Sequence, residues 1–307
     1  MEASDVVVRI ILLSQTVIGV LGNSFLLYIN MRLYFTGYSL KCKDLILKHL
    51  NIANFLTLLC RGVPQTMAAF GLQDFLGDWG CKLIFYLHRV GRGMSISSTC
   101  LLSAFQAMTI SPRDSVWAQL KTKTRKESDS FICLIWVLYF LGNIGLLKNV
   151  SGKQANKNMT SRKDYGYCSS VRLDKTVQIL IAAFLSFPDV VCMGIMLWAS
   201  SSIVLLLYRH KQRMQHVLRT TVSPRFSPES RATKTVLLLV STFVFFYMLS
   251  CVFQVWFTLV YNPSLLLQNM AVVIAGCFPS VSPFLLLSQD SSSCKLCFMW
   301  VKTRKSP

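Results

Sequence analysis

Two arginines and one aspartate lie in segments that are otherwise almost entirely apolar. Arg89 and Arg92 belong to the run CKLIFYLHRVGR, and Asp189 lies in a later run. Ionised side chains are costly in an apolar environment, so they face a hydrated cavity or an opposite charge and mark candidate functional sites. We therefore predict that Asp189 is the partner of Arg92 and that both line a polar cavity.

Neighbouring polar residues on the same run can be explained without a polar cavity. Tyr86 lies three residues before Arg89, so the two side chains fall near one face of a helix. Lys82, His88 and Arg89 could instead extend their polar ends to the membrane interface. For His88 we favour the interface.

The sequence shows no pattern of a catalytic site. It has no HExxH, P-loop or GxSxG motif and no cluster of metal ligands, and its four histidines are scattered. The final apolar run lacks the lysine that a retinal pigment needs. We expect neither an enzyme nor a cofactor.

Long apolar runs must position these residues. The chain is 53% hydrophobic and only 15% charged, whereas soluble domains average about 25% charged. A run of about 20 apolar residues crosses a bilayer as a helix, because no backbone group can stay unpaired in lipid. The sequence thus predicts an all-α membrane protein, a single domain with a bundle of seven transmembrane helices followed by a cytoplasmic tail at 289–307. The predicted spans are Val6–Met31, Lys43–Phe70, Cys81–Ile110, Ser130–Leu147, Thr176–Tyr208, Thr233–Tyr261 and Leu265–Ser288.

The distribution of charge predicts the orientation. The net charge of +19 would suggest nucleic acid in a soluble protein, but 19 Lys and Arg residues fall on one side of the spans and 8 on the other. Cytoplasmic loops are the richer ones, so we place the N-terminus outside and the C-terminus inside. The outer loop Lys148–Lys175 is basic, but its two glycosylation sequons, at Asn149 and Asn158, favour the outside. The start of the chain is acidic, so we expect no cleavable signal peptide.

Four of the eleven cysteines differ from the others, most of which lie inside the apolar runs. Cys81 and Cys168 both face the oxidising side, so we predict a disulfide between them, with two unpaired thiols as the alternative. Cys294 and Cys297 follow the last span, where palmitoylation beside an interfacial helix is predicted and two unmodified thiols are the alternative.

Small and amide residues inside the spans predict helix packing. Such residues let helices approach and form hydrogen bonds across an interface. Asn54, together with Arg61, is expected to join an interhelical polar network. The other small or amide residues expected to pack between helices are Gly22, Asn23, Asn51, Ser95, Ser97, Ser98 and Thr99. Three prolines, Pro188, Pro279 and Pro283, are expected to kink their helices.

Several long motifs, taken in order, give the chain a resemblance to a known family. They include the run from His88 to Arg113 and the basic stretch RHKQRMQH that begins at Arg209. They also include SPRFSPESRAT from Ser223, VSTFVFFY ending at Tyr247, and FPSVSPF from Phe278. Over essentially the whole chain these segments resemble the vomeronasal type 1 receptor family of G protein-coupled receptors.

The resemblance implies a pheromone receptor of the plasma membrane that couples to a G protein of the inhibitory class. The family lacks the Asp/Glu-Arg-Tyr and Asn-Pro-x-x-Tyr motifs of rhodopsin-like receptors, and this sequence lacks them too. One departure is Pro188 before Asp189, where the family commonly has histidine. A bitter-taste-like chemoreceptor and a membrane transporter or channel remain alternatives, the latter disfavoured because Asp189 is its only candidate acid near the midplane. An inactive relic is a weaker alternative.

The expected mechanism joins an outer ligand site to an inner basic face. A small, largely apolar pheromone or odorant binds among spans three, five, six and seven and favours splaying of spans five and six. Candidate ligand-binding residues are Tyr86, Arg89, Asp189, Tyr247, Gln254, Gln268 and Asn269. Candidate G protein-coupling residues, which could also contact anionic membrane lipid, are Arg113, Arg209, Lys211, Arg213, Arg225 and Arg231. We expect no nucleic acid as a partner.

Overall fold

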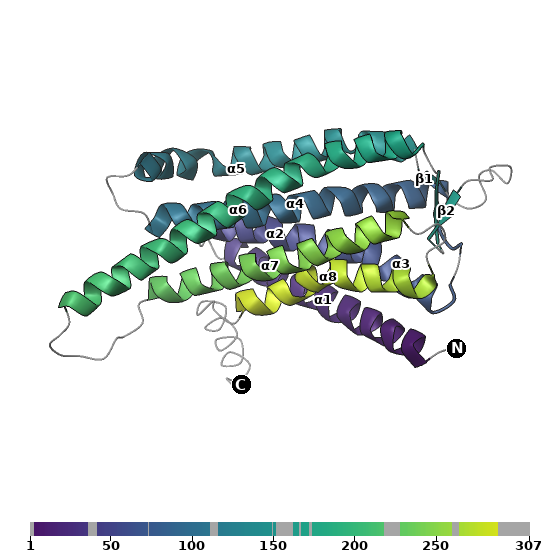
Figure 1. Cartoon of the computed structure of the whole chain (residues 1–307), viewed down its shortest axis with the longest axis horizontal. Helices are drawn as coiled ribbons and strands as arrows, with labels where there is room; N and C mark the ends of the chain where they lie inside the picture. The colour runs from purple at the N-terminus through teal and green to yellow at the C-terminus, as the bar shows by residue number, and fades with distance from the viewer. Residues whose placement is uncertain are drawn as a thin grey trace.

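Each long apolar run forms a helix in the computed structural model (Figure 1). The structure describes residues 3–35, 42–72, 74–110, 116–148, 150–151, 162–165, 167–171, 174–217, 228–259 and 264–287. The helices are α1 (Ala3–Phe35), α2 (Cys42–Thr57), α3 (Val63–Ala69), α4 (Asp78–Ile110), α5 (Val116–Gly142), α6 (Lys175–Val217), α7 (Pro228–Leu259) and α8 (Leu265–Leu287). They run side by side as one bundle, and the prediction of a helical architecture is confirmed.

A single turn of π-helix, η1 (Leu58–Gly62), joins α2 to α3 into one continuous rod. In this turn the N–H of Val63 donates to the carbonyl of Leu58, five residues earlier. The next residue, Pro64, has no N–H, and its ring would clash with the carbonyl four residues before it in a regular helix. The wider turn avoids that clash, and the sequence reading did not anticipate it.

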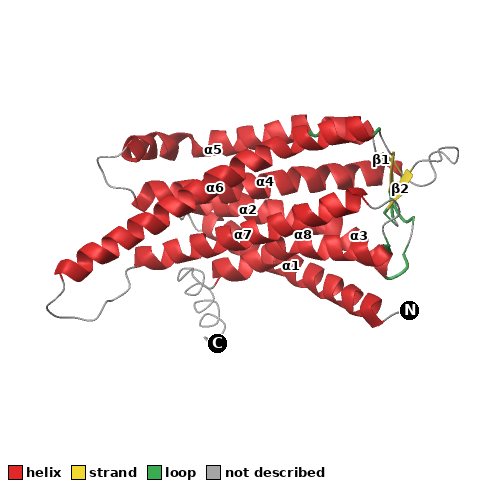
Figure 2. Ribbon diagram, in the orientation of Figure 1, coloured by secondary structure: helices red, strands yellow, loops and turns green. Residues whose placement is uncertain are grey.

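A small sheet caps one end of the bundle (Figure 2). Its strands β1 (Val150–Ser151), β2 (Arg162–Asp164) and β3 (Ser169–Val171) are antiparallel, with β3 in the middle. The 3₁₀ turn η2 (Ile144–Lys148) leads from α5 toward β1. The sheet lies at the end of the bundle where α1 begins, which we call the sheet end. The sequence predicted only helices and missed this element.

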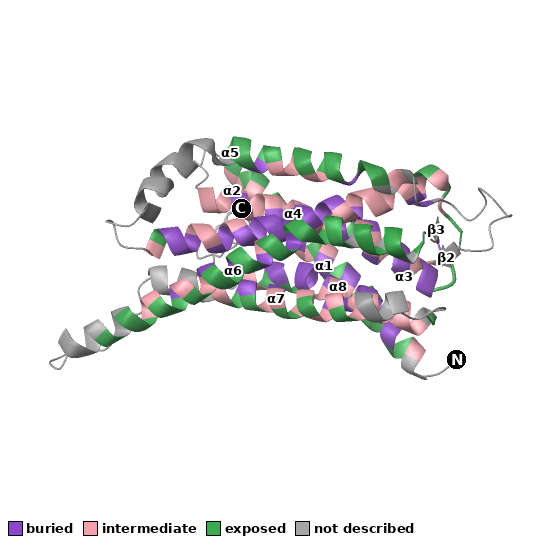
Figure 3. Ribbon diagram, turned by 45° about the horizontal axis from the view of Figure 1, so that its top comes forward, coloured by how far each residue is buried: buried purple, intermediate pink, exposed green. Residues whose placement is uncertain are grey.

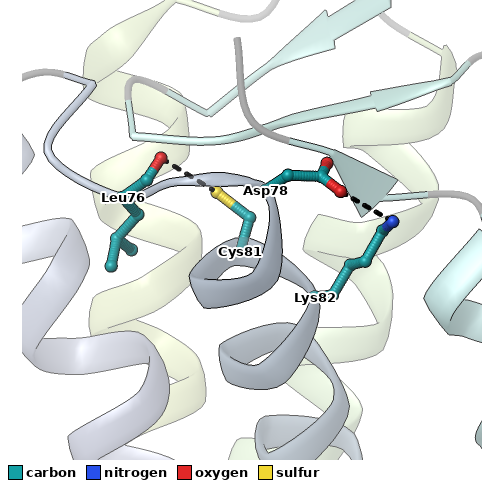
Figure 4. A network of polar contacts seen from close by, with 4 residues as sticks. All are labelled: Leu76, Asp78, Cys81 and Lys82. Carbon is teal, nitrogen blue, oxygen red and sulfur yellow. Dashed lines mark hydrogen bonds and ion pairs between the residues drawn. The ribbon is translucent and has the colours of Figure 1, made fainter. Parts of the chain in front are cut away.

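A disulfide between Cys81 and Cys168 fastens the sheet to α4. This is the pair that the sequence singled out. Cys81 lies in the first turn of α4, where its Sγ is 3.8 Å from the carbonyl oxygen of Leu76 and the neighbouring Lys82 forms an ion pair with Asp78 at 2.7 Å (Figure 4).

Aromatic side chains fill the space beneath the sheet. The Tyr167 ring is buried, with its centroid 6.1 Å from that of Phe85 and 6.3 Å from that of Phe75. Burial raises the pKa of the Tyr167 phenol, so the side chain stays neutral at physiological pH. The sheet is therefore packed against the bundle as well as covalently attached to it.

The bundle is packed around α4 (Figure 3). This helix is buried along most of its length, and its residues join the main core cluster with residues of α2, α5, α6, α7 and α8. In contrast, α5 and α6 expose many apolar side chains, such as Phe184 and Phe187 on α6. Such an apolar exterior is suited to contact with lipid.

Among the residues that the structure describes, three helices are long and apolar enough to cross a membrane, namely the segments Asp5–Phe35, Ile179–Arg209 and Leu266–Leu287. Two shorter apolar stretches, Asp129–Gly142 and Leu237–Phe253, lie in α5 and α7. The number of spans and the orientation of the chain thus remain predictions.

Polar side chains connect the helices where the sequence predicted packing. Asn23 on α1 donates from Nδ2 to the carbonyl of Pro279 on α8 at 2.9 Å. Asn54 on α2 donates to the Ser282 hydroxyl at 2.9 Å and accepts from the Ser95 hydroxyl at 2.6 Å. The Asn54 side chain thus bonds to α8 and α4 together, which confirms its predicted role in an interhelical network.

Gly93 permits the close approach of α4 and α5. A Cβ atom at this position would lie 2.2 Å from the ring of Tyr139, whose hydroxyl is 2.9 Å from that of Ser97. We expect Gly93→Ala to displace the ring and to lower the free energy of unfolding by about 1–3 kcal/mol, as overpacking commonly does. Thermal unfolding in detergent measures the change.

Gly194, in α6, provides the matched control for this prediction. A Cβ there meets nothing within 4 Å, so Gly194→Ala should leave stability unchanged or raise it slightly. Equal stability of the two variants would show that the approach of α4 and α5 does not depend on the missing side chain.

Candidate functional site

A cavity with a volume of about 50 Å³ opens inside the bundle between α2, α4, α7 and α8. This is room for a few water molecules. Its lining residues are Thr57, His88, Arg92, Ser95, Ile96, Phe243, Phe246, Tyr247, Ser250, Ala275, Phe278 and Pro279. The cavity thus combines an aromatic wall from α7 and α8 with a polar wall from α4. Sequence reasoning expected α6 to contribute, whereas here α2 does.

Tyr247 connects the cavity to the predicted charged pair. Its hydroxyl donates to Oδ2 of Asp189 on α6 at 3.1 Å. Its ring lies under the Arg92 guanidinium, 5.2 Å from the ring centroid to Cζ. A cation over an aromatic face contributes up to about 2 kcal/mol when it is desolvated. One tyrosine thus links an arginine of α4 to a carboxylate of α6.

The predicted direct pairing of Asp189 with Arg92 differs from this arrangement. Across the residues that the structure describes, neither Arg92 nor Arg89 lies within 4.0 Å of the Asp189 carboxylate, although both act on it electrostatically. Asp189 is 6% exposed, so its charge is balanced inside the bundle and not by solvent. Arg92 lines the cavity, as predicted, and Asp189 reaches the cavity through Tyr247.

His88 is buried, so the prediction that it extends to the interface is wrong. It is 7% exposed and lines the cavity, and its Nδ1 has no hydrogen-bond partner within the described ranges. The neighbouring Lys82 does turn outward, to Asp78 and the ring of Trp79. The difference follows from packing, since Lys82 is followed by the exposed Leu83, whereas no residue of α4 from 84 to 91 is exposed.

Tyr86 lies away from the cavity and against α5. Its hydroxyl donates to the carbonyl of Phe140 at 2.7 Å. Each step of three residues turns a helix by about 60° from its starting face, so Tyr86 and Arg92 point about 120° apart. Arg89, halfway between them, is partly buried. Neither Tyr86 nor Arg89 is among the residues that line the cavity, so the face that the sequence assigned to them is not its polar wall.

Two further candidate ligand-binding residues, Asn269 and Gln268, are not among the residues that line the cavity. Asn269 on α8 is buried and accepts a hydrogen bond from Gln65 on α3 at 2.9 Å. Gln268 lies in the first turns of α8. Gln254 belongs to α7, but its side chain is outside the described part of the structure.

The candidate coupling and modification residues are only partly described. Arg209 is exposed near the end of α6 that lies opposite the sheet end. Lys211 and Arg213 on α6 and Arg231 on α7 have backbones that the structure describes, but their side chains are not. The other predicted residues lie outside the described residues, namely Arg113, Arg225, Asn149, Asn158, Cys294 and Cys297.

Sequence reasoning missed Thr57, Ser250 and Ala275 as lining residues. They are small or weakly polar residues in apolar runs, so composition alone gives no signal for them. It also missed Gln65, whose burial among apolar neighbours marked it as a residue that needs a partner.

The bundle, its apolar exterior and its internal polar site are consistent with a helical membrane receptor. Residues 6–299 match the model of the vomeronasal organ pheromone receptor family, and the chain belongs to this family. It is 54% identical over 289 residues to vomeronasal type-1 receptor 4 of Homo sapiens, covering 94% of this chain and 96% of that protein.

Other relatives extend the match. Vomeronasal type-1 receptor 2 of Homo sapiens is 48% identical over 285 residues, covering 93% of this chain and 72% of that protein. Vomeronasal type-1 receptor 90 of Rattus norvegicus is 32% identical over 284 residues, covering 92% of this chain and 90% of that protein. The predicted family is therefore confirmed, and the bitter-taste alternative is set aside.

Proposed function

We propose that this chain is a chemosensory receptor that binds a small pheromone or odorant in the cavity beside Tyr247 and activates a G protein of the inhibitory class. The observation that carries the proposal is the contact of Tyr247 with both Asp189 and Arg92, which ties α6, α7 and α4 together at the cavity wall. A ligand that changes the position of Tyr247 acts on three helices at once. Such a ligand shifts the population toward the conformation it binds better.

The proposed topology places the sheet end outside the plasma membrane and the opposite end in the cytoplasm, with seven spans in one domain. The disulfide at the sheet end supports this orientation, because disulfides persist on the oxidising side. In this orientation the sequons at Asn149 and Asn158 lie outside, and the acylation sites Cys294 and Cys297 lie in the cytoplasmic tail at 289–307.

Activation of a G protein tests the proposed function. We would express the chain with an inhibitory-class G protein and screen pooled urinary and steroid-like volatiles for nucleotide exchange. An active pool gives a dose response that depends on the receptor. Silence in every pool, with the receptor at the cell surface, would contradict the proposal, and flux or ligand-independent currents in liposomes would indicate a transporter or channel instead.

Asp189→Ala is expected to raise the half-maximal concentration of an active ligand at least tenfold at equal surface expression. The substitution removes the acceptor of the Tyr247 hydroxyl and leaves two arginines without their nearest acid. Losing a hydrogen bond to a charged group costs about 1.5–3 kcal/mol, which is a factor of ten or more in affinity. The measurement is the same nucleotide-exchange assay.

Asp174→Ala is the matched control for this prediction. Asp174 is exposed and directly precedes α6, so its replacement removes the same charge at the sheet end. Equal dose responses for the two variants would show that the response to the ligand does not depend on Asp189.

The proposed coupling surface is basic and consists of Arg113, Arg209, Lys211, Arg213, Arg225 and Arg231. We expect the triple change of Arg113, Arg209 and Arg213 to glutamine to reduce G protein activation strongly at equal surface expression. Basic residues near the bilayer also attract anionic lipid, by about 1 kcal/mol each, and both uses are compatible.

The matched control replaces Lys82, Lys148 and Lys175 with glutamine. These residues lie at the sheet end, so the net charge changes equally on the other side of the bundle. The coupling role fails if the first triple variant signals as well as this control.

A further inference from the structure

A second cavity, of about 10 Å³, lies beside the first one, between α1, η1, α4 and α8. It has room for about one water molecule. Three residues, Thr57, His88 and Ala275, line both cavities. The two spaces thus share one wall at these three residues.

The chemistry of the second cavity is that of hydrogen-bond donors and one cation. Arg61 lines it together with Gln15 and Thr16, and the lining includes no carboxylate. The Gln15 amide is already engaged, since it donates to the carbonyl of Val273 at 2.9 Å. Within the described part of the chain, Arg61 has no ion pair. A guanidinium held among apolar helices without an acid favours an anion.

The π-turn is what directs Arg61 into this space. Leu58, Arg61 and Gly62 all belong to η1, and all three line the second cavity. The turn holds one more residue than a regular helical turn, so it changes the direction of every side chain that it carries. Single π-turns inside α-helices occur frequently at functional sites.

His88 is the dividing residue. It is 7% exposed, lies between Arg61 and Arg92, which both act on it electrostatically, and keeps an unused hydrogen-bonding nitrogen at Nδ1. Because His88 lines both cavities, a molecule that occupied both of them would contact this side chain. On the far side stands the aromatic wall of Phe243, Phe246 and Phe278.

We infer that the two cavities are one ligand site divided by His88, in which Arg61 binds the anionic end of a small amphiphilic molecule and the aromatic wall holds its apolar end. This inference rests on the proposed function, because it specifies the ligand of the same site. It adds a ligand class, an organic acid with an apolar body, and a specificity-determining position, Arg61, outside the set predicted from the sequence.

The test measures binding directly and without a G protein, so it is independent of the outcome of the activation assay. Purified full-length receptor is heated with hexanoate, hexanol or hexylamine, three probes with the same carbon chain. Unfolding is followed with a thiol-reactive dye that reports the exposure of buried cysteines such as Cys60 and Cys100. We expect hexanoate to bind at least tenfold more tightly than the alcohol or the amine.

Arg61→Gln is expected to abolish this preference, and Arg61→Lys, which keeps the charge, should retain part of it. Lys82→Gln removes the same charge outside both cavities and should leave the preference intact. His88→Ala should improve the binding of the longer decanoate relative to hexanoate, because the dividing wall is gone.

Three outcomes overturn the inference. The first is equal affinity of the wild-type receptor for the acid and the alcohol, a result that needs no variant to fold. The second is an Arg61→Gln variant that unfolds cooperatively and still prefers hexanoate. The third is stabilisation by inorganic sulfate alone to the same extent, which would identify a free-anion site without an apolar partner. A silent activation assay with normal hexanoate binding would overturn only the proposed function.

Discussion

Replacing Cys168 with alanine is expected to lower the free energy of unfolding by about 2–5 kcal/mol and to reduce the amount of receptor at the cell surface. The disulfide closes a loop between residues that are 87 positions apart, so its loss releases a large chain entropy in the unfolded state. It also removes the covalent link between the sheet and α4, leaving the packing of Val150 and Tyr167 against the bundle. Thermal unfolding of purified receptor and surface labelling measure the two effects.

Cys133→Ala is the control for the disulfide. Cys133 is an exposed free thiol on α5, and its replacement should change neither quantity. The double variant of Cys81 and Cys168 should be no less stable than the single variants, because one bond is lost in each case. A Cys168 variant as stable as the Cys133 variant would show that packing alone holds the sheet.

The second large effect is expected at Asn54, which is fully buried. Asn54→Leu removes its bonds to Ser95 and Ser282 and leaves two hydroxyls of α4 and α8 without these partners. Each unsatisfied buried group costs about 1–3 kcal/mol, so we expect a total loss of about 2–6 kcal/mol. Because the side chain links three helices, the transition should also become less cooperative. Thermal or denaturant unfolding measures both changes.

Single serine variants measure separately what each of the two hydrogen bonds of Asn54 contributes to stability. Ser95→Ala and Ser282→Ala each remove one bond and should each cost about 1 kcal/mol. Ser202→Ala is the control, since the Ser202 hydroxyl bonds only within α6, to the carbonyl of Trp198. An Asn54 variant no less stable than the Ser202 variant would mean that the network contributes specificity without stability.

The sequence predicted the helices well because long apolar runs have few other options in lipid. It also predicted the packing role of Asn54 and singled out Cys81 and Cys168, because amides in apolar runs and cysteines outside them are rare. The sheet escaped notice because its strands have only two or three residues and pair across a polar loop. Such short pairings leave no period in the sequence.

The site was predicted only in part, because the direction of a side chain depends on how each helix is rotated against its neighbours. Asp189, Arg92 and Tyr247 were found because their polarity stands out in apolar surroundings. Their arrangement was not predicted, because Tyr247 contacts Asp189 through its hydroxyl and Arg92 through its ring, and the sequence does not show which contact a tyrosine makes. His88 was misplaced because no residue of α4 from 84 to 91 is exposed, which depends on the neighbouring helices and cannot be read from one helix alone.

The π-turn at Leu58–Gly62 makes the second rod of the bundle sensitive to chain length. The turn takes up one residue more than a regular helical turn, so removing one residue would restore regular hydrogen bonding and keep α3 nearly in phase with α2. Asn54 and Gln65 would both keep their partners, but the ring of Pro64 would then meet the carbonyl four residues before it. A local repair of the backbone would thus move the conflict to Pro64, and length at this turn is as constrained as residue type.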